Sequence, residues 1–384
     1  MNPLYEQMQT SVFERMSLAA SRYGAVNLGQ GFPDFGWPDE ILDAAARAVR
    51  HGSGQYAPSR GLPELRESIA DHYNRHHGLS LDATNVCVTS GATEALAASI
   101  FASVVPGDEV IVLTPAYDAY VPLIRQAGGI VREVQLKPPE WRISRDAIAA
   151  AVTGRTRAIV FNNPHNPTGR LFDMEELGAI ASVARDHDLI VISDEVWEHL
   201  LLDGQSFTPI AALPGMAERT FKCGSAGKMF SLTGWKIGWL VAPPEKATLA
   251  ARAHQFLTFA SAPSLQSAVA FGLRDGDSWL APMRTGFAEA RDRMTRDLRA
   301  VGFTVLDSAA TYFLCVDLAA SGIGVDDERF AAAAVAQAGV AVVPLSAFAE
   351  TDPPQHLIRL CFAKQPETIA AGVAALDRAR RLFV

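Results

Sequence analysis

The sequence is poor in cysteine. Its four cysteines, Cys87, Cys223, Cys315 and Cys361, are scattered over 384 residues, and none forms a Cys-x-x-Cys pair. This spacing argues against a structural zinc site or a disulfide framework and predicts a reducing, cytoplasmic environment. A chain of this length can bury a large core without such cross-links.

Long apolar runs and excess positive charge are also lacking. No run approaches the ~20 residues that span a bilayer, and the first twenty residues have charges where a signal peptide would be apolar. Lys and Arg total 34 against 42 Asp and Glu, a net charge of −8. We therefore expect a soluble protein that does not bind nucleic acid. The short basic run near residue 380 is expected to be a solvated helix face.

The hydrophobic pattern predicts an α/β fold. Short β-branched runs at 86–90, 110–114, 130–136, 158–161, 189–193, 220–224 and 237–241 read as strands, with helical patterns at 92–105, 118–128, 145–152 and 173–187. Their alternation predicts a mostly parallel, doubly wound sheet. After about residue 275 a long helix (279–301), strands at 303–306, 312–317, 340–344 and 357–362, a helix at 326–338 and a terminal helix indicate a smaller α+β unit. The expected domains are an N-terminal arm contributing to the small domain (1–40), a large domain (41–275) and a small domain (276–384).

Lysine is scarce, and its placement is informative. Six of the 34 basic residues are Lys, and two of them lie in the glycine-rich segment 225–238. Lys228 follows a predicted strand, and a lysine in a cleft can form Schiff bases with carbonyl compounds. Ser225 and Lys236, on either side of it, could both bind an anion. Taken alone, the segment could equally be a surface loop with ordinary cations.

Two further elements lie at the ends of predicted strands. Asp194 ends a buried apolar run, where a carboxylate needs a positive partner such as a protonated ring nitrogen; a helix cap is the alternative. Gly91, Ala92 and Thr93 form a strand-to-helix turn, whose free N–H groups can bind a phosphate. A glycine at such a turn is common, so this signal is weak by itself.

Asn166 and Arg359 complete the set. Two prolines make the path around Asn166 rigid, which leaves its side chain as a positioned donor, although a plain Pro/Gly loop is the alternative. Arg359 lies inside an apolar strand and needs a buried anion, either a structural carboxylate or the carboxylate of a substrate. Together these elements describe a ligand with a phosphate ester, an aldehyde and a ring nitrogen, bound at the strand ends of one sheet.

Over nearly its whole length the chain resembles the class I/II aminotransferases, pyridoxal-phosphate enzymes of fold type I. The motifs of segment 225–238 and of residues 27–35 carry the resemblance, which is greatest to the branch of kynurenine/glutamine, methionine and succinyldiaminopimelate aminotransferases. It implies a seven-stranded, mostly parallel sheet domain and a smaller α+β domain. It also implies a homodimer with shared active sites.

The resemblance implies roles for individual residues. Lys228 would form the Schiff base and move the proton, and Asp194 would pair with the pyridine nitrogen. Cofactor contacts would come from Asn166 and Tyr117 on the ring, from Gly91, Ala92, Thr93, Ser225 and Lys236 on the phosphate, and from Tyr56 on the partner's phosphate. Gly31, Asn166 and Arg359 would bind the substrate carboxylate.

Two departures from the family pattern stand out. Trp197 occupies the place of a tyrosine whose hydroxyl bonds the cofactor's phenolic oxygen, and an indole N–H can donate but not accept. Segment 255–264 contains no cation, which argues against a dedicated aspartate enzyme. Ala260 and Ser261 stand where kynurenine-type enzymes have an aromatic residue and a histidine, so an aromatic substrate is not specified either.

The sequence therefore predicts transfer of the amino group of an L-amino acid to a 2-oxo acid, with 2-oxoglutarate or pyruvate as acceptor. The donors left open are of the methionine, glutamine, aromatic or succinyldiaminopimelate type. Two alternatives use the same scaffold: β-elimination from cysteine conjugates, and a pyridoxal-phosphate-binding effector domain of a regulator. No metal site is expected.

Overall fold

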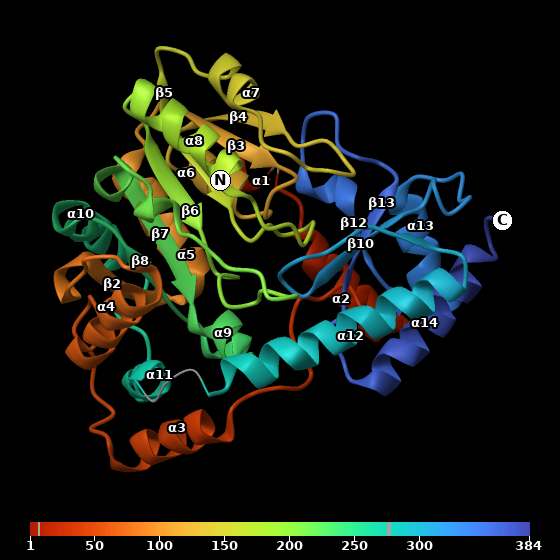
Figure 1. The fold of residues 1–384 in the computed structure, drawn as a ribbon, viewed down its shortest axis with the longest axis horizontal. Helices are drawn as coiled ribbons and strands as arrows, with labels where there is room; N and C mark the ends of the chain where they lie inside the picture. Colours follow the sequence, from red (N-terminus) through yellow and green to blue (C-terminus); the bar gives the residue numbers. More distant parts are fainter. Residues whose placement is uncertain (7, 275–277) are drawn as a thin grey trace.

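A computed structural model describes residues 1–6, 8–274 and 278–384 of the chain. Its larger unit is built on a seven-stranded sheet with the order β2-β8-β7-β6-β5-β3-β4 (Figure 1). The strands are β2 (Val86–Ser90), β3 (Glu109–Thr114), β4 (Ile130–Gln135), β5 (Thr156–Asn162), β6 (Ile190–Asp194), β7 (Thr220–Ser225) and β8 (Ile237–Val241). β8 runs antiparallel to both its neighbours, and the other neighbouring pairs are parallel. The predicted seven-stranded, mostly parallel sheet is confirmed.

Both faces of the central part of this sheet are buried, which explains the apolar runs of strands such as β3. Along β3, Val110 and Val112 pack into one core cluster, and Ile111 and Leu113 pack into another on the opposite face. The first cluster is shared with α5 (Gly91–Ser103), α6 (Tyr120–Gln126) and α10 (Pro244–His254), the second with α7 (Arg145–Ala150) and α8 (Met174–Asp186).

Three more helices cover the β2–β8 end of the sheet. They are α3 (Asp39–His51), α4 (Pro63–His77) and α11 (Pro263–Arg274), and sequence analysis named none of them, nor α10. The shorter segments are α1 (Pro3–Glu6), α9 (Ala226–Met229), η1 (Ala83–Asn85), η2 (Ile210–Ala212), η3 (Ala217–Arg219), η4 (Thr233–Trp235) and η6 (Leu345–Phe348). Within the described part of the chain, no helix combines the length and apolar character needed to cross a membrane.

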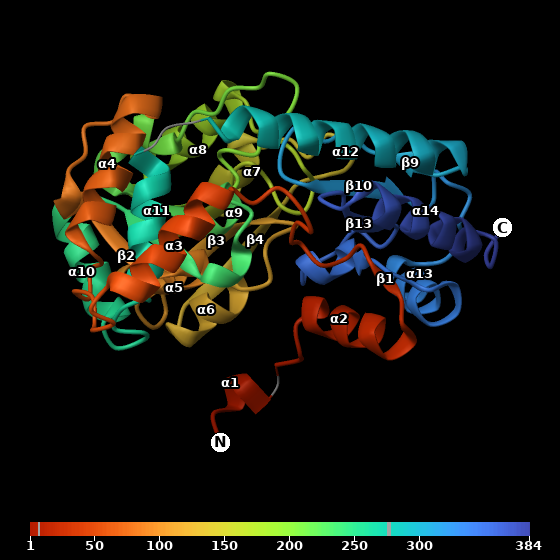
Figure 2. The ribbon, with the colours of Figure 1, turned by 90° about the horizontal axis from the view of Figure 1, so that it is seen from below.

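The smaller unit contains the antiparallel sheet β12-β13-β10-β9. Its strands are β9 (Thr304–Val305), β10 (Phe313–Asp317), β12 (Val343–Pro344) and β13 (Leu357–Cys361), and it packs with α12 (Leu280–Ala300), α13 (Asp327–Ala333) and α14 (Pro366–Arg380). In Figure 2 the long helix α12 runs from the larger unit across the smaller one. The expectation of an α+β unit at the C-terminal end agrees with this arrangement.

The N-terminal segment is built into the smaller unit. β1 (Val26–Asn27) pairs in parallel with β11 (Val340–Ala341), and α2 (Val12–Tyr23) lies beside that pair (Figure 2). The division at residue 40 stays a proposal, and the expected boundary at 275/276 lies outside the described residues.

Two predicted elements of the smaller unit were wrong in detail. The single strand expected at 340–344 is two strands in different sheets, because β11 pairs with β1 and β12 pairs with β13. The helix expected at 326–338 is α13 followed by a π-helical turn, η5 (Ala334–Ala338), which ends at Gly339 with φ 80.

Candidate active site

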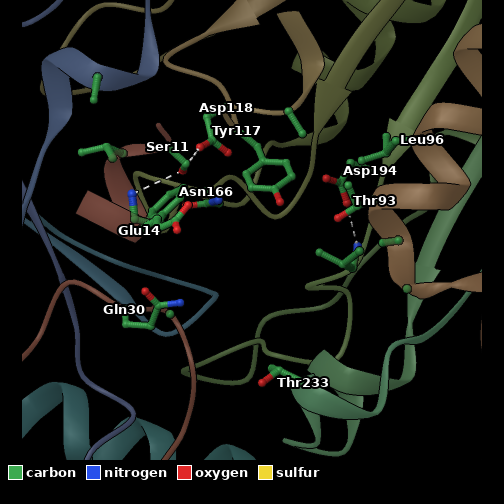
Figure 3. A pocket seen from close by; sticks show the side chains of 18 of the residues that line it. Ser11, Glu14, Gln30, Thr93, Leu96, Tyr117, Asp118, Asn166, Asp194 and Thr233 are labelled. Carbon is green, nitrogen blue, oxygen red and sulfur yellow. Dashed lines mark hydrogen bonds between the residues drawn. The ribbon is translucent and has the colours of Figure 1, made fainter. Parts of the chain in front are cut away.

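A cavity of about 1110 Å³ lies where the carboxyl ends of β3, β5, β6 and β7 meet the smaller unit. Every residue predicted for the site except Tyr56 lines it: Gly31, Gly91, Ala92, Thr93, Tyr117, Asn166, Asp194, Trp197, Ser225, Lys228, Lys236 and Arg359. Figure 3 shows Asp194 and Thr93 together on one side, with Asn166, Ser11 and Glu14 on the other. This is the place where open α/β sheets bind ligands. Tyr56 lies elsewhere, with 86% of its surface exposed.

One wall of the cavity is an anion cradle. α5 begins at Gly91 directly after β2, so its first N–H groups lack intrahelical partners. The backbone packs tightly there: a Cβ added to Gly238 would lie 2.4 Å from the carbonyl carbon of Gly91 and 2.5 Å from the nitrogen of Ala92. A Cβ on Gly91, whose φ is 72, would come within 3.1 Å of Lys236 Nζ. The helix terminus and an ammonium group thus converge on one point, as binding a phosphate requires.

Asp194 is a buried carboxylate aimed at the cavity. Tyr120 Oη donates to its Oδ2 at 2.6 Å, and the Val196 N–H lies 3.4 Å from Oδ1. Burial raises the pKa of Asp194 to about 6, while the Tyr120 hydroxyl and the charge of Lys228 act against that rise. The alternative of a plain helix cap does not describe this group, because no helix begins at residue 195. Sequence analysis missed Tyr120, although it lies one helical turn after Tyr117.

Lys228 lies in the short helix α9, directly after β7. Its Nζ donates to Tyr312 Oη at 3.1 Å and sits 4.7 Å from the centre of the Trp197 ring. Burial lowers the pKa of Lys228 to about 8; the charges of Arg359 and Lys236 add to the effect, and Cys361 and Asp194 oppose it. A lysine with a lowered pKa is available as an uncharged nucleophile near neutral pH.

Arg359 is buried in β13, and no carboxylate of the described residues lies within ion-pair distance of it, although the charge of Asp118 acts on it from farther away. It is 1% exposed, donates from Nη1 to Asn166 Oδ1 and from Nη2 to the Gly29 carbonyl, both at 2.8 Å, and stacks on Phe313. Its Nε is buried with no hydrogen-bond partner among the described residues. Burial lowers the pKa of Arg359 to about 10. Since no structural salt bridge holds it within the described chain, the guanidinium retains capacity for an external anion.

Asn166 and Trp197 lie between these groups. The backbone N–H of Asn166 donates to Asn162 Oδ1 at 2.6 Å, and its side-chain oxygen faces Arg359, so its amide NH2 remains free to donate. Trp197 is buried against Tyr312, with ring centres 4.5 Å apart at 88°. The structure therefore packs the indole as part of the wall behind Lys228.

The N-terminal segment also lines the cavity, which sequence analysis did not foresee. Residues 8–15 and Ser17 contribute to the wall. Ser11 Oγ donates to Asp118 (Figure 3). The Phe13 ring lies 4.8 Å from the guanidinium carbon of Arg359. No local pattern could reveal this, because the contacts join segments far apart in the chain.

Comparison with known proteins agrees with this geometry. The family described as aminotransferase class I and II matches residues 23–376. A probable N-succinyldiaminopimelate aminotransferase of Mycobacterium tuberculosis is 43% identical, covering 96% of each chain, and the Escherichia coli methionine aminotransferase is 39% identical, covering 98% of this chain and 97% of its own. The solved structure of the N-succinyldiaminopimelate aminotransferase from M. tuberculosis aligns with a TM-score of 0.95, covering 98% of this chain and 99% of the other. The chain belongs to the class I and II aminotransferases, enzymes that depend on pyridoxal phosphate.

Proposed function

We propose that the chain transfers the amino group of a long-chain L-amino acid to a 2-oxo acid, with Lys228 as the residue that holds the cofactor covalently. The observation that carries the proposal is the convergence of Lys228, Asp194 and Arg359 on one cavity. When bound, pyridoxal phosphate withdraws electrons from the substrate's α-carbon, so that a proton there becomes removable.

The residues present fit that cofactor. The N-terminus of α5, Ser225 and Lys236 supply donors for the phosphate. Asp194 supplies a negative charge for a protonated ring nitrogen, and its partner Tyr120 keeps it oriented. The free amide group of Asn166 and the ring of Tyr117 are the contacts proposed for the phenolic oxygen and the ring face.

We assign to Lys228 Nζ the removal and return of the proton at the substrate's α-carbon. A lysine with a pKa of about 8 exchanges between amine and ammonium near neutral pH, which allows the same atom to take the proton and return it. The substrate carboxylate is assigned to Arg359 and to the Gly31 backbone, and the unpaired Arg359 Nε supports this choice. Both substrates carry that carboxylate, so both half-reactions would use the same contact.

For the amino donor we favour the N-succinyldiaminopimelate type, a long side chain that ends in a carboxylate. The cavity is lined from the anion cradle as far as residues 8–15, so it offers room beside the cofactor for a long donor. Arg15 of α2 is among the lining residues and is exposed, next to Glu14. A methionine-type donor is the second candidate, since the E. coli relative carries that name.

The experiment compares two donors, N-succinyldiaminopimelate and methionine, in the wild type and in Arg15→Ala. If Arg15 meets the distal carboxylate, the substitution raises KM for the succinylated donor about two- to fivefold and leaves KM for methionine unchanged, as expected for an exposed charge pair. Arg22→Ala is the matched control, because Arg22 lies on the same helix outside the cavity, over the Tyr23 ring. If the wild type turned over methionine but did not use the succinylated donor, this choice of substrate would be rejected.

We further propose that the active unit is a homodimer in which Tyr56 reaches the partner's site. Tyr56 and Phe256 each expose 86% of their surface, and Phe259 exposes 46%. The rings of Tyr56 and Phe259 meet edge to face, 5.5 Å apart, so the aromatic groups form one patch. Large exposed apolar groups gathered in this way are typical of an interface. Light scattering tests this proposal: the wild type should have the mass of a dimer, and Phe256→Asp should shift it toward a monomer. A monomeric wild type would overturn the proposal.

A further inference from the structure

Tyr312 lies behind Lys228 and belongs to no part of the proposed machinery described so far. It is fully buried and is not among the residues that line the cavity. Its ring packs against Trp197, Phe313 and Phe287, with ring centres 4.5, 5.0 and 6.0 Å away. The hydroxyl is therefore fixed in place by a rigid aromatic cluster.

The two hydrogen bonds of this hydroxyl have a defined direction. Tyr312 Oη donates its only proton to the Gly31 carbonyl at 2.6 Å, so toward Lys228, 3.1 Å away, it can only accept. Burial, together with Cys361, raises the pKa of Tyr312 well above its ordinary value, which keeps the phenol neutral. Tyr312 is thus a fixed acceptor for the lysine and no source of protons.

The Gly31 end of this link reaches the carboxylate site. Gly29 accepts from Arg359, and Gly31, two residues on, accepts from Tyr312. A Cβ on Gly31 would lie 2.7 Å from the Phe313 ring, so the turn is pressed against the same aromatic cluster. One short turn therefore joins the residue proposed to bind the carboxylate to the residue that holds the lysine.

We propose that Tyr312 is a positioning residue that holds the uncombined Lys228 amine at the cavity wall and links its position to the Gly29–Gly31 turn. This inference rests on the proposed role of Lys228. When Lys228 is released from the cofactor, its amine would otherwise sample several rotamers. The fixed acceptor keeps Nζ at one place, from which it can serve the α-carbon in each turnover.

The sign of the effect on Lys228 follows from the direction of the hydrogen bond. An ammonium donates a stronger hydrogen bond than an amine, so the Tyr312 oxygen favours the charged form. The other groups that act on Lys228 are Asp194 on β6, Arg359 and Cys361 on β13 and Lys236 after η4, and a change at Tyr312 leaves their side chains unaltered. Removing the hydroxyl should therefore lower the pKa of Lys228 further.

The test is Tyr312→Phe, studied in the full-length holoenzyme carrying pyridoxamine phosphate, in which Lys228 is uncombined. Acetic anhydride labelling of the Lys228 peptide, followed by mass spectrometry across pH, measures the fraction of free amine. We expect labelling of Lys228 at pH 7 to be about three- to tenfold faster than in the wild type. We also expect kcat to fall while KM rises by a smaller factor, since Arg359 keeps its hydrogen bonds to Asn166 and Gly29 and only the Gly31 end of the turn is released.

Tyr73→Phe is the matched control. Tyr73 is equally buried and bonds Glu198 and Trp239 through its hydroxyl, away from Lys228. A Lys228 labelling profile in Tyr312→Phe that matches the wild type, or the same change in both variants, would overturn the inference. Failure of the proposed function is seen separately: borohydride reduction of the pyridoxal form would then leave Lys228 unmodified.

Discussion

Lys222 and Lys228 are two lysines of one strand–helix segment with opposite surroundings. Lys222, in β7, is 1% exposed and pairs with Glu195 at 2.9 Å and Glu198 at 2.7 Å. These carboxylates hold the pKa of Lys222 well above its ordinary value despite the opposing effect of burial. Lys228 lies in α9, the short helix that directly follows β7. It has no carboxylate within ion-pair distance among the described residues, and burial lowers its pKa to about 8.

The difference shows that burial alone does not lower the pKa of a lysine, because the neighbouring charges decide the direction of the shift. A buried ammonium with two carboxylates is a structural charge, whereas one that meets a hydroxyl and an aromatic face can lose its proton near neutral pH. The following substitutions test this contrast.

The largest effect is expected at Lys228. Lys228→Ala should leave the protein folded but lower turnover by about 10⁴-fold or more, because both the covalent attachment and the proton carrier are lost. Spectra and borohydride reduction of the purified protein measure the attachment. Lys246→Ala, on the outer helix α10, is the control and should behave as the wild type. Wild-type activity in Lys228→Ala would remove the basis of the whole proposal.

Lys222→Met should act on stability and leave the chemistry in place. It leaves Glu195 and Glu198 buried without their cation, which costs about 3–5 kcal/mol in the free energy of unfolding. Urea unfolding of the holoenzyme measures the loss, and activity per folded molecule should stay within about threefold of the wild type. Loss of covalent cofactor at unchanged stability would show that the two lysines have been assigned the wrong roles.

Arg359→Ala tests another buried cation, for which, as for Lys228, the described residues provide no carboxylate within ion-pair distance. A buried charged contact to a substrate is worth on the order of 2–5 kcal/mol when one partner is removed, so KM should rise for the amino acid and the 2-oxo acid alike. Steady-state kinetics with each substrate varied in turn measure it. If only stability changed, Arg359 would be a structural residue like Lys222.

The contrast also explains what the sequence could and could not reveal. The residues at strand ends, such as Asp194 and Lys228, were predictable because parallel strands bring their carboxyl ends to one edge. Lys222 carried no signal, since its partners Glu195 and Glu198 lie on another strand end and reach it only through the pairing of β6 with β7. Tyr312 and the segment at Ser11 were missed for the same reason: their contacts span 84 and 107 residues of chain.

In the fold, continuous apolar strands were located to within one or two residues, but several helices were not identified. α4 has a proline in its first turn and a left-handed Gly78 at its end, which are readable signals, yet its buried face includes the polar Ser68 and His72, which interrupt the apolar pattern. The prediction of a single strand at 340–344 was wrong for a different reason. Its first two residues belong to one sheet and its last two to another, and only the pairing partners Val26 and Arg359 reveal the break.

The smallest effect is expected at Trp197, whose ring centre lies 4.7 Å from Lys228 Nζ. The family pattern that the chain resembles has a tyrosine at this position. Its hydroxyl would hydrogen-bond the cofactor's phenolic oxygen and favour the ionised form of that oxygen. Restoring it with Trp197→Tyr should lower the pH midpoint of the bound cofactor's absorbance change by up to about one pKa unit, if that bond is worth ~1.5 kcal/mol. The smaller ring also loosens the packing against Tyr312, at 4.5 Å between ring centres, so Trp141→Tyr, a buried tryptophan in another core cluster, controls for general destabilisation. Superimposable titrations of wild type and Trp197→Tyr would mean that the introduced hydroxyl does not reach the phenolic oxygen.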